Sequence, residues 1–259
     1  IILSGEYAGV FGFRGIALPA SEHTMTVTFE ETPSTTSLKL HSMAIDSNHP
    51  KWEAYMSRII SLCSAHSGES FLGKLTIAGN LPVGKGMGSS TALVITTCRC
   101  LLGDKATEEF CKTVEEHVNV GNSGIDFAVI WKNAPVIFKK GEPIQPFEKG
   151  STLLSGSQLI DTGTPDQTTP ELIAWMKQRA PEPEIRTALE KIGRCTERLL
   201  AGEDLKTVMR DHHRAQVALG VVPEAAQVLI AEIEQAGGAA KVLGAGARTG
   251  GAGMVLQIP

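Results

Sequence analysis

Three alternating glycines followed by two serines are the feature that most constrains this chain. The segment reads Leu81-Pro82-Val83-Gly84-Lys85-Gly86-Met87-Gly88-Ser89-Ser90-Thr91, and an apolar run follows at once. Because glycine has no Cβ atom, such a backbone turns tightly and brings its amide groups close to a ligand. A helix starting at the serines would add unpaired N–H groups and its dipole, which attract anions. The segment therefore predicts a phosphate-binding loop ahead of a helix.

Two common phosphate-loop patterns do not fit this segment. Residues 79–85 match the first part of the P-loop pattern, but Gly86 stands where Ser or Thr is required. The glycines read G-x-G-x-G, whereas the Rossmann pattern is G-x-G-x-x-G. A glycine-rich turn without a ligand is the remaining alternative. A strand predicted over 71–78 and a mostly buried helix over 90–102 favour the phosphate loop, because they supply the strand–loop–helix context.

Composition limits the class of protein. The chain has 259 residues, a net charge of −4 and a pI near 6.0, which gives no reason to expect nucleic acid or a membrane surface as a partner. No apolar run approaches the roughly 18 residues that span a bilayer. Five cysteines without regular spacing indicate reduced thiols in a cytoplasmic protein rather than disulfides or zinc ligands. The neighbouring His212 and His213 are expected to be solvated on a helix.

The remaining elements follow from periodicity and capping residues. Domains of 1–152 and 153–259 are expected, because helices dominate beyond about residue 152. Pro33 to Ser37 predicts a polar turn. Strands are predicted at 1–3, 16–31, 153–161, 239–243 and 253–258, a hairpin at 126–130 and 135–138, and helices at 52–63 and 107–117 and after Pro170, Pro183, Asp204 and Pro223.

A second segment with candidate chemistry lies at 115–126. It reads Glu-Glu-His-Val-Asn-Val-Gly-Asn-Ser-Gly-Ile-Asp. Phosphoryl transfer needs one carboxylate to hold Mg²⁺ and another to receive or position the proton of the acceptor hydroxyl. The segment supplies candidates for both. The alternative is a surface turn, since turns favour Asp, Asn and Gly for conformational reasons alone.

The loop motif Pro82-x-Gly84-x-Gly86-x-Gly88-Ser89-Ser90 resembles the second motif of the GHMP kinases. These enzymes phosphorylate small molecules with ATP and include galactokinase, homoserine kinase, mevalonate kinase and phosphomevalonate kinase. The resemblance implies an α+β, two-domain GHMP kinase fold. Its N-terminal domain would be like domain 2 of ribosomal protein S5, and its C-terminal domain would be a ferredoxin-like α/β domain. It also implies that residues 82 and 84–90 (Pro82, Gly84, Lys85, Gly86, Met87, Gly88, Ser89, Ser90) bind ATP, with Ser90 reaching Mg²⁺.

The 121–126 segment is similar to the mevalonate kinase stretch G-N-P-S-G-[IV]-D-N. That likeness implies that Asp126 is the base and that Glu115, eleven residues earlier, binds Mg²⁺. The chain departs from the stretch by lacking its Pro and by placing Phe127 after the aspartate. Glu116 therefore competes with Glu115 for the metal role.

The acceptor side rests on two further likenesses. The stretch from Leu3 to Gly12 resembles the first family motif, which implies that Glu6 and Tyr7 face the acceptor. The family's lysine would precede Ile1. The stretch from Leu159 to Thr168 is similar to a mevalonate kinase stretch that ends V-P-R-S-T. This likeness implies that Thr168 contacts the substrate. The alternative is that Thr168 caps a helix. Asp166 replaces the basic residue there, which disfavours a phosphate on the acceptor.

The stretch from Lys241 to Gly251 resembles the third family motif, K-x-[ST]-G-A-G-G-G-G. It implies that Gly244 and Gly246 close against the phosphate loop. Arg248 would contact phosphate or lie in solvent, and the same two alternatives hold for Lys85.

The chain is accordingly predicted to be an ATP- and Mg²⁺-dependent kinase of a small-molecule hydroxyl, with mevalonate as the expected acceptor. Alternatives are phosphomevalonate, homoserine or a sugar as acceptor, and a nucleotide-binding protein without activity. Neither nucleic acid nor a membrane is an expected partner. The sequence leaves a homodimer open.

Overall fold

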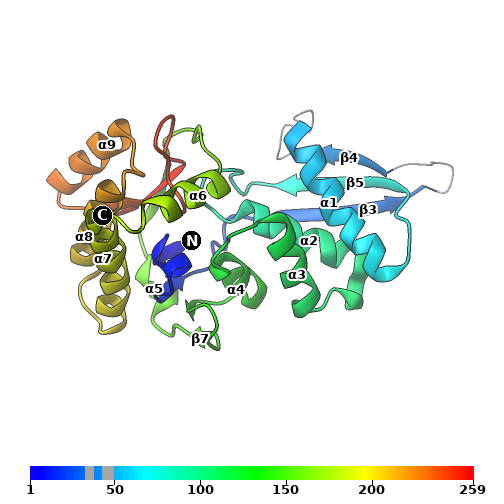
Figure 1. The fold of residues 1–259 in the computed structure, drawn as a ribbon, viewed down its shortest axis with the longest axis horizontal. Helices are drawn as coiled ribbons and strands as arrows, with labels where there is room; N and C mark the ends of the chain where they lie inside the picture. The colour runs from blue at the N-terminus through cyan, green and yellow to red at the C-terminus, as the bar shows by residue number, and fades with distance from the viewer. Residues whose placement is uncertain (33–37, 43–49) are drawn as a thin grey trace. The chain divides into compact units, whose positions relative to one another are not determined.

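The computed structural model describes residues 1–32, 38–42 and 50–259, which form a mixed α+β structure, as predicted (Figure 1). By their internal contacts the residues divide into two compact units. The larger unit consists of Ile1–Pro19, Gly84–Gly88 and Gly121–Pro259, and the smaller unit consists of Ala20–Val83 and Ser89–Val120. This division does not follow a boundary at residue 152, because residues 121–259 share one unit. The expected domains 1–152 and 153–259 remain a prediction.

The smaller unit places helices beside a sheet of order β3-β5-β4. Strand β3 (Met25–Glu31) pairs antiparallel with β5 (Gly73–Gly79), which pairs parallel with β4 (Leu38–Ser42) on its other side. Its helices, which pack on one another, are α1 (Pro50–Ser67), α2 (Ser89–Leu102) and α3 (Glu108–Val118), with a 3-10 turn η2 (Gly103–Lys105) before α3. Helix α2 also packs against β3 and buries the apolar run that begins at Ala92, as predicted for a mostly buried helix.

One sheet of the larger unit has the order β1-β2-β6-β7, and every neighbouring pair is antiparallel. The strands are β1 (Ile2–Ser4), β2 (Gly15–Ala17), β6 (Val136–Phe138) and β7 (Gln145–Pro146). Helix α4 (Ile125–Lys132) packs on β2 and β6, the 3-10 turn η1 (Ala8–Phe11) follows β1, and the short α5 (Gly150–Leu153) follows β7.

The second sheet of the larger unit has the antiparallel order β8-β10-β9. Its strands are β8 (Gln158–Asp161), β9 (Ala239–Val242) and β10 (Met254–Ile258), and its helices are α6 (Thr169–Arg179), α7 (Pro183–Leu200), α8 (Leu205–Leu219) and α9 (Glu224–Gln235). Helices α7 and α8 lie side by side (Figure 1). The four helix starts predicted from Pro170, Pro183, Asp204 and Pro223 are confirmed.

Three predicted elements need correction. Residues 126–130 are not a strand but lie in α4, in which Ile125, Phe127, Ala128 and Val129 are buried. A continuous apolar run has no periodicity that could distinguish a buried strand from a buried helix, so the strand prediction for this segment is wrong. The strand expected over 16–31 is two strands, and that expected over 153–161 begins only at residue 158. The turn predicted at 33–37 lies outside the described residues.

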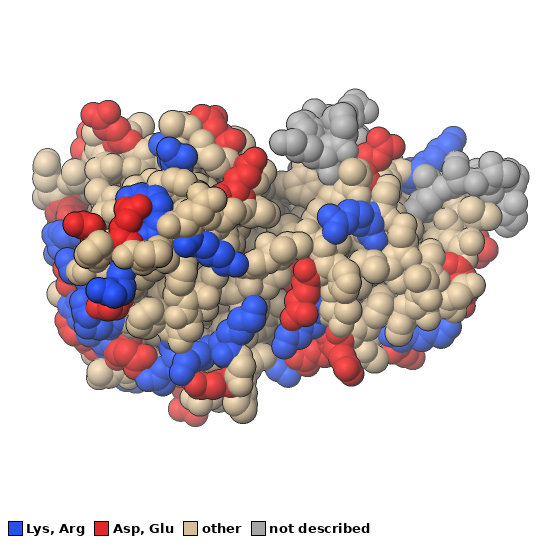
Figure 2. All heavy atoms as spheres, viewed as in Figure 1, with Lys and Arg blue, Asp and Glu red and all other residues tan. Residues whose placement is uncertain are grey.

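The charged side chains and the cysteines of the structure can be compared with the expectations from composition. On the face shown in Figure 2, acidic and basic side chains are interspersed. All five cysteines are free thiols. In the described ranges, no helix combines the length and the apolar character that crossing a bilayer requires.

Candidate active site

The glycine loop joins β5 to α2, and α2 begins at Ser89, so the predicted strand–loop–helix order is confirmed. Pro82 lies just beyond β5, and Met87 and Ser89 are buried. Gly86 has a φ of +80°, and a Cβ atom added there would lie 2.4 Å from the carbonyl oxygen of Leu243. Gly244 is equally tight, since an added Cβ would lie 2.6 Å from Gly86 Cα. The predicted approach of Gly244 to the loop is thus confirmed, and only glycine permits it.

The loop is also anchored by Lys85. Its carbonyl oxygen accepts a hydrogen bond from Met254 N at 3.0 Å, and its ammonium group pairs with the carboxylate of Asp161 in β8. Lys85 therefore does not lie free in solvent. At Gly246, an added Cβ atom would instead lie 2.2 Å from the carbonyl oxygen of Val221. Contact with the loop is thus seen at Gly244, and a loop contact of Gly246 stays a prediction.

Asp126 lies at the other end of the loop, in the first turn of α4. A Cβ atom added at Gly88 would be 3.0 Å from Asp126 Oδ1, so the carboxylate rests against the loop backbone. Burial raises the pKa of Asp126, and the negative charge of Glu6 acts in the same direction. A carboxylate with a raised pKa, next to a glycine loop, suits the transfer of a proton from an acceptor hydroxyl.

Glu115 lies in α3 of the smaller unit, where its side chain is tied to α2 and to the end of its own helix. Its Oε1 atom accepts a hydrogen bond from the hydroxyl of Thr91 at 2.8 Å, and Oε2 accepts one from Asn119 Nδ2 at 2.9 Å. Glu115 is 2% exposed, whereas Glu116 is exposed to solvent. Burial beside α2, which begins at the serines, favours Glu115 over Glu116 for the metal role.

The donor set on α2 and α3 fits Mg²⁺. Carboxylate and hydroxyl oxygens are the hard ligands that this ion takes. The ranges 1–32, 38–42 and 50–259 hold no group of three or more His, Cys, Asp or Glu side chains arranged for a metal. Mg²⁺ in phosphoryl-transfer sites does not need one, because one or two carboxylates act together with substrate phosphates and water.

A buried ionic cluster in the larger unit was not predicted. Glu6, expected to face the acceptor, pairs with the ammonium group of Lys241 in β9, and both side chains are fully buried. His212 Nε2 lies 3.0 Å from Glu6 Oε2, so His212 is not solvated, and His213 is also buried. Burial opposes ionisation of Glu6, but Lys241 and then His212 outweigh it and hold the pKa of Glu6 below its ordinary value. Burial lowers the pKa of His212, although the charge of Glu6 acts in the opposite direction.

Tyr7 is fixed next to this cluster. Its backbone is in the left-handed region at φ 58°, and its hydroxyl donates to the carbonyl oxygen of Ala245 at 2.6 Å. Both Glu6 and Tyr7 are thus buried, with side chains that already contact the segment around Lys241. No local pattern could have paired Glu6 with Lys241, because 235 residues separate them.

Thr168 is the N-cap of α6. Its backbone N–H and its hydroxyl both donate to Glu171 Oε2, at 2.7 and 2.8 Å. The capping role, one of the two alternatives for this residue, is confirmed. Arg248 is exposed, and its guanidinium carbon lies 4.6 Å from the centroid of the Trp175 ring, on which it stacks.

Comparison with known proteins places these features in a family context. Residues 54–133 match the family described as GHMP kinases N terminal domain. Three mevalonate kinases of known structure are similar to the whole chain. The Methanococcus jannaschii enzyme is 20% identical, with 87% of it covered and a TM-score of 0.75. The L. major enzyme in complex with R-mevalonate is 18% identical, with 84% covered and a TM-score of 0.70.

The third, from methicillin-resistant Staphylococcus aureus MRSA252, is 22% identical, with 86% covered and a TM-score of 0.68. All three comparisons cover 100% of this chain. A search of curated protein sequences gives no match. Residues 54–133 therefore match the GHMP kinase N-terminal domain, and the chain as a whole has the fold of the mevalonate kinases.

Proposed function

We propose that this chain is an ATP-dependent kinase that phosphorylates the hydroxyl group of a small molecule. The observation that carries the proposal is the position of Asp126 against Gly88. A carboxylate able to receive a proton thereby lies next to the loop predicted to hold the phosphates. The GHMP kinase domain match and the shared fold support the same reaction class.

The proposed mechanism is mainly one of positioning. The amides of Gly84, Gly86 and Gly88 and the start of α2 bind the ATP phosphates. Ser90 and Glu115 would hold Mg²⁺, which when bound neutralises part of the phosphate charge. Asp126 orients the acceptor hydroxyl and takes its proton while the oxygen attacks the γ-phosphorus in line, and the bond from that phosphorus to the bridging oxygen breaks to release ADP.

The proposed acceptor is mevalonate, with phosphomevalonate as the first alternative and homoserine or a sugar after it. The motif likeness and the three mevalonate kinases of the same fold favour mevalonate. Asp166, exposed beside Thr249 and Gly250, argues against an acceptor that carries a phosphate at this place, because like charges repel. A panel of these acceptors, with ATP consumption as the readout, separates the alternatives.

Substitution of Asp126 tests the reaction class. Asp126→Asn is expected to keep nucleotide affinity and to lower phosphoryl transfer by at least about 100-fold, the scale of a lost general base. Nucleotide binding is measured by calorimetry and turnover by a coupled ADP assay. Near-wild-type turnover would remove the proposed role. Nucleotide binding by the wild-type chain without turnover of any acceptor would favour a non-catalytic relative.

A further inference from the structure

We propose that Tyr55 and Asn119 are positioning residues that hold the Glu115 carboxylate and the start of α2 ready for the divalent ion. The inference rests on the proposed function, since it concerns the metal role assigned to Glu115 and Ser90. Neither Tyr55 nor Asn119 is among the residues to which the family resemblance assigns a role. All four residues lie in the smaller unit.

A continuous chain of hydrogen bonds joins these residues. Asn119 Nδ2 donates to Glu115 Oε2 at 2.9 Å. The hydroxyl of Tyr55 lies 3.1 Å from Asn119 Oδ1 and 3.1 Å from the carbonyl oxygen of Ser90, and its one proton is shared between these two acceptors. One side chain of α1 thus contacts the backbone of Ser90 directly and Glu115 through Asn119.

The direction of the bonds decides what Tyr55 does. An amide side chain presents a donor on one side and an acceptor on the other. With the Tyr55 hydroxyl directed at Oδ1, the NH₂ group of Asn119 is turned toward Glu115. That bond and the bond from Thr91 together fix the carboxylate from two sides. Residues that orient a metal ligand in this way typically change metal affinity by about 10–100-fold when they are lost.

Packing alone does not require the Tyr55 hydroxyl. The ring of Tyr55 meets the ring of Trp52 edge to face, with centroids 5.7 Å apart. Phenylalanine would keep this contact and the buried ring area. Tyr55→Phe therefore removes the hydrogen bonds while leaving the packing in place.

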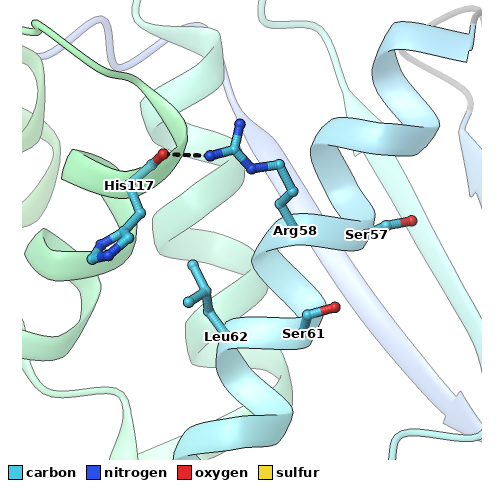
Figure 3. Close-up of a pocket in the computed structure, with 5 residues that line it drawn as sticks. All are labelled: Ser57, Arg58, Ser61, Leu62 and His117. Carbon is cyan, nitrogen blue, oxygen red and sulfur yellow. Dashed lines mark hydrogen bonds between the residues drawn. The ribbon is translucent and has the colours of Figure 1, made fainter.

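Helix α1 offers a matched control one turn further along. Arg58 Nη2 donates to the carbonyl oxygen of His117 at 2.7 Å (Figure 3). This bond also ties α1 to the end of α3, but it does not touch Glu115. It borders a surface hollow of about 330 Å³ lined by Ser57, Arg58, Ser61, Leu62 and His117. Arg58→Gln therefore tests whether any loosening of α1 from α3 has the same effect.

The experiment measures Mn²⁺ binding to the full chain in the presence of a non-hydrolysable ATP analogue, by electron paramagnetic resonance. Tyr55→Phe and Asn119→Ala are each expected to weaken Mn²⁺ binding by about 10-fold. Arg58→Gln is expected to match the wild type. In turnover assays the Mg²⁺ concentration for half-maximal rate should rise in the first two variants. Their kcat at saturating Mg²⁺ should stay close to the wild-type value.

Unchanged Mn²⁺ affinity in both Tyr55→Phe and Asn119→Ala would overturn the inference. Equal weakening in Arg58→Gln would also overturn it, because the effect would then be general loosening. The Mn²⁺ readout is independent of turnover. A chain that phosphorylates no acceptor but shows the expected Mn²⁺ pattern would refute the proposed function and retain the inference. A wild-type chain that binds no Mn²⁺ with nucleotide would overturn the inference and the metal role together.

Discussion

At the scale of single residues, the pairing of Glu6 with Lys241 changes how the first motif is understood. A carboxylate that is fully buried against an ammonium group has little freedom to contact a diffusing acceptor. Its neighbour Tyr7 bonds to Ala245, three residues before Arg248, and Arg248 stacks on Trp175 of α6. We therefore expect Glu6 to influence acceptor binding indirectly. It would do so by fixing the backbone of the first motif rather than by contacting the acceptor.

Breaking this pair should be costly. Lys241→Met would leave the Glu6 charge buried without its partner, and we expect a loss of about 3–5 kcal/mol in the free energy of unfolding. The double variant Lys241→Met with Glu6→Gln should recover much of that loss, because no uncompensated charge remains. Urea denaturation followed by circular dichroism measures both.

The control for that measurement is Lys85, which pairs with Asp161 where both side chains remain partly exposed. Lys85→Met should cost no more than about 1 kcal/mol, since water screens such pairs. Equal losses in the free energy of unfolding for Lys85→Met and Lys241→Met would contradict the interpretation that the pair of Glu6 and Lys241 is buried and unscreened by water.

At the scale of elements, the phosphate loop contains glycines in two different environments. Gly84 and Gly86 both have positive φ, but an added Cβ meets nothing within 4 Å at Gly84 and a carbonyl oxygen at 2.4 Å at Gly86. Gly84→Ala should cost only the left-handed backbone penalty of about 1–2 kcal/mol. Gly86→Ala should cost about 1–3 kcal/mol more, from the steric clash, and should raise the KM for ATP. Denaturation midpoints and ATP titrations test the difference, and identical behaviour of the two variants would argue against the backbone contact with Leu243.

The start of α6 gives a second prediction at this scale. Thr168→Ala should lower stability by about 1 kcal/mol through loss of the cap, while the KM for the acceptor stays unchanged. Thr107, the N-cap of α3, accepts a hydrogen bond from Phe110 N and serves as the control, with a similar loss expected for Thr107→Ala. A raised acceptor KM in the Thr168 variant alone would show that this side chain also binds substrate.

At the scale of the whole molecule, the predicted boundary near residue 152 can be tested with a fragment. Residues 153–259 contain the β8-β10-β9 sheet and α6 to α9, but Lys241 would lose Glu6, and the cluster around Leu172 and Ile185 would lose Tyr7 and Ala8. We expect the isolated fragment to bind a hydrophobic dye and to lack a sharp thermal transition. Cooperative unfolding like that of the full chain would instead support an independent domain.

Local sequence determined much of this protein. Glycine adopts a positive φ without strain, so the alternating glycines determined where the loop forms. Capping residues such as Thr107 and Asp204 determined where helices begin. Both signals are local, because the backbone conformation at these positions depends on nearby atoms alone. The mixed α+β class followed from the same signals. The helix that begins at Ile125 escaped this reasoning, because a run that is apolar throughout carries no period.

Only the tertiary structure decided which distant groups meet. Three sets of contacts join residues from different elements. Asp126 approaches Gly88, Lys241 is buried with Glu6 and His212, and Tyr55 is linked through Asn119 to Glu115. Burial of a charged or polar group is stable only when a partner is supplied, and that partner is chosen by packing, not by neighbours in the chain. The sequence by itself therefore determined where a phosphate loop and its helix form. The fold decided which side chains surround them and which of those are buried.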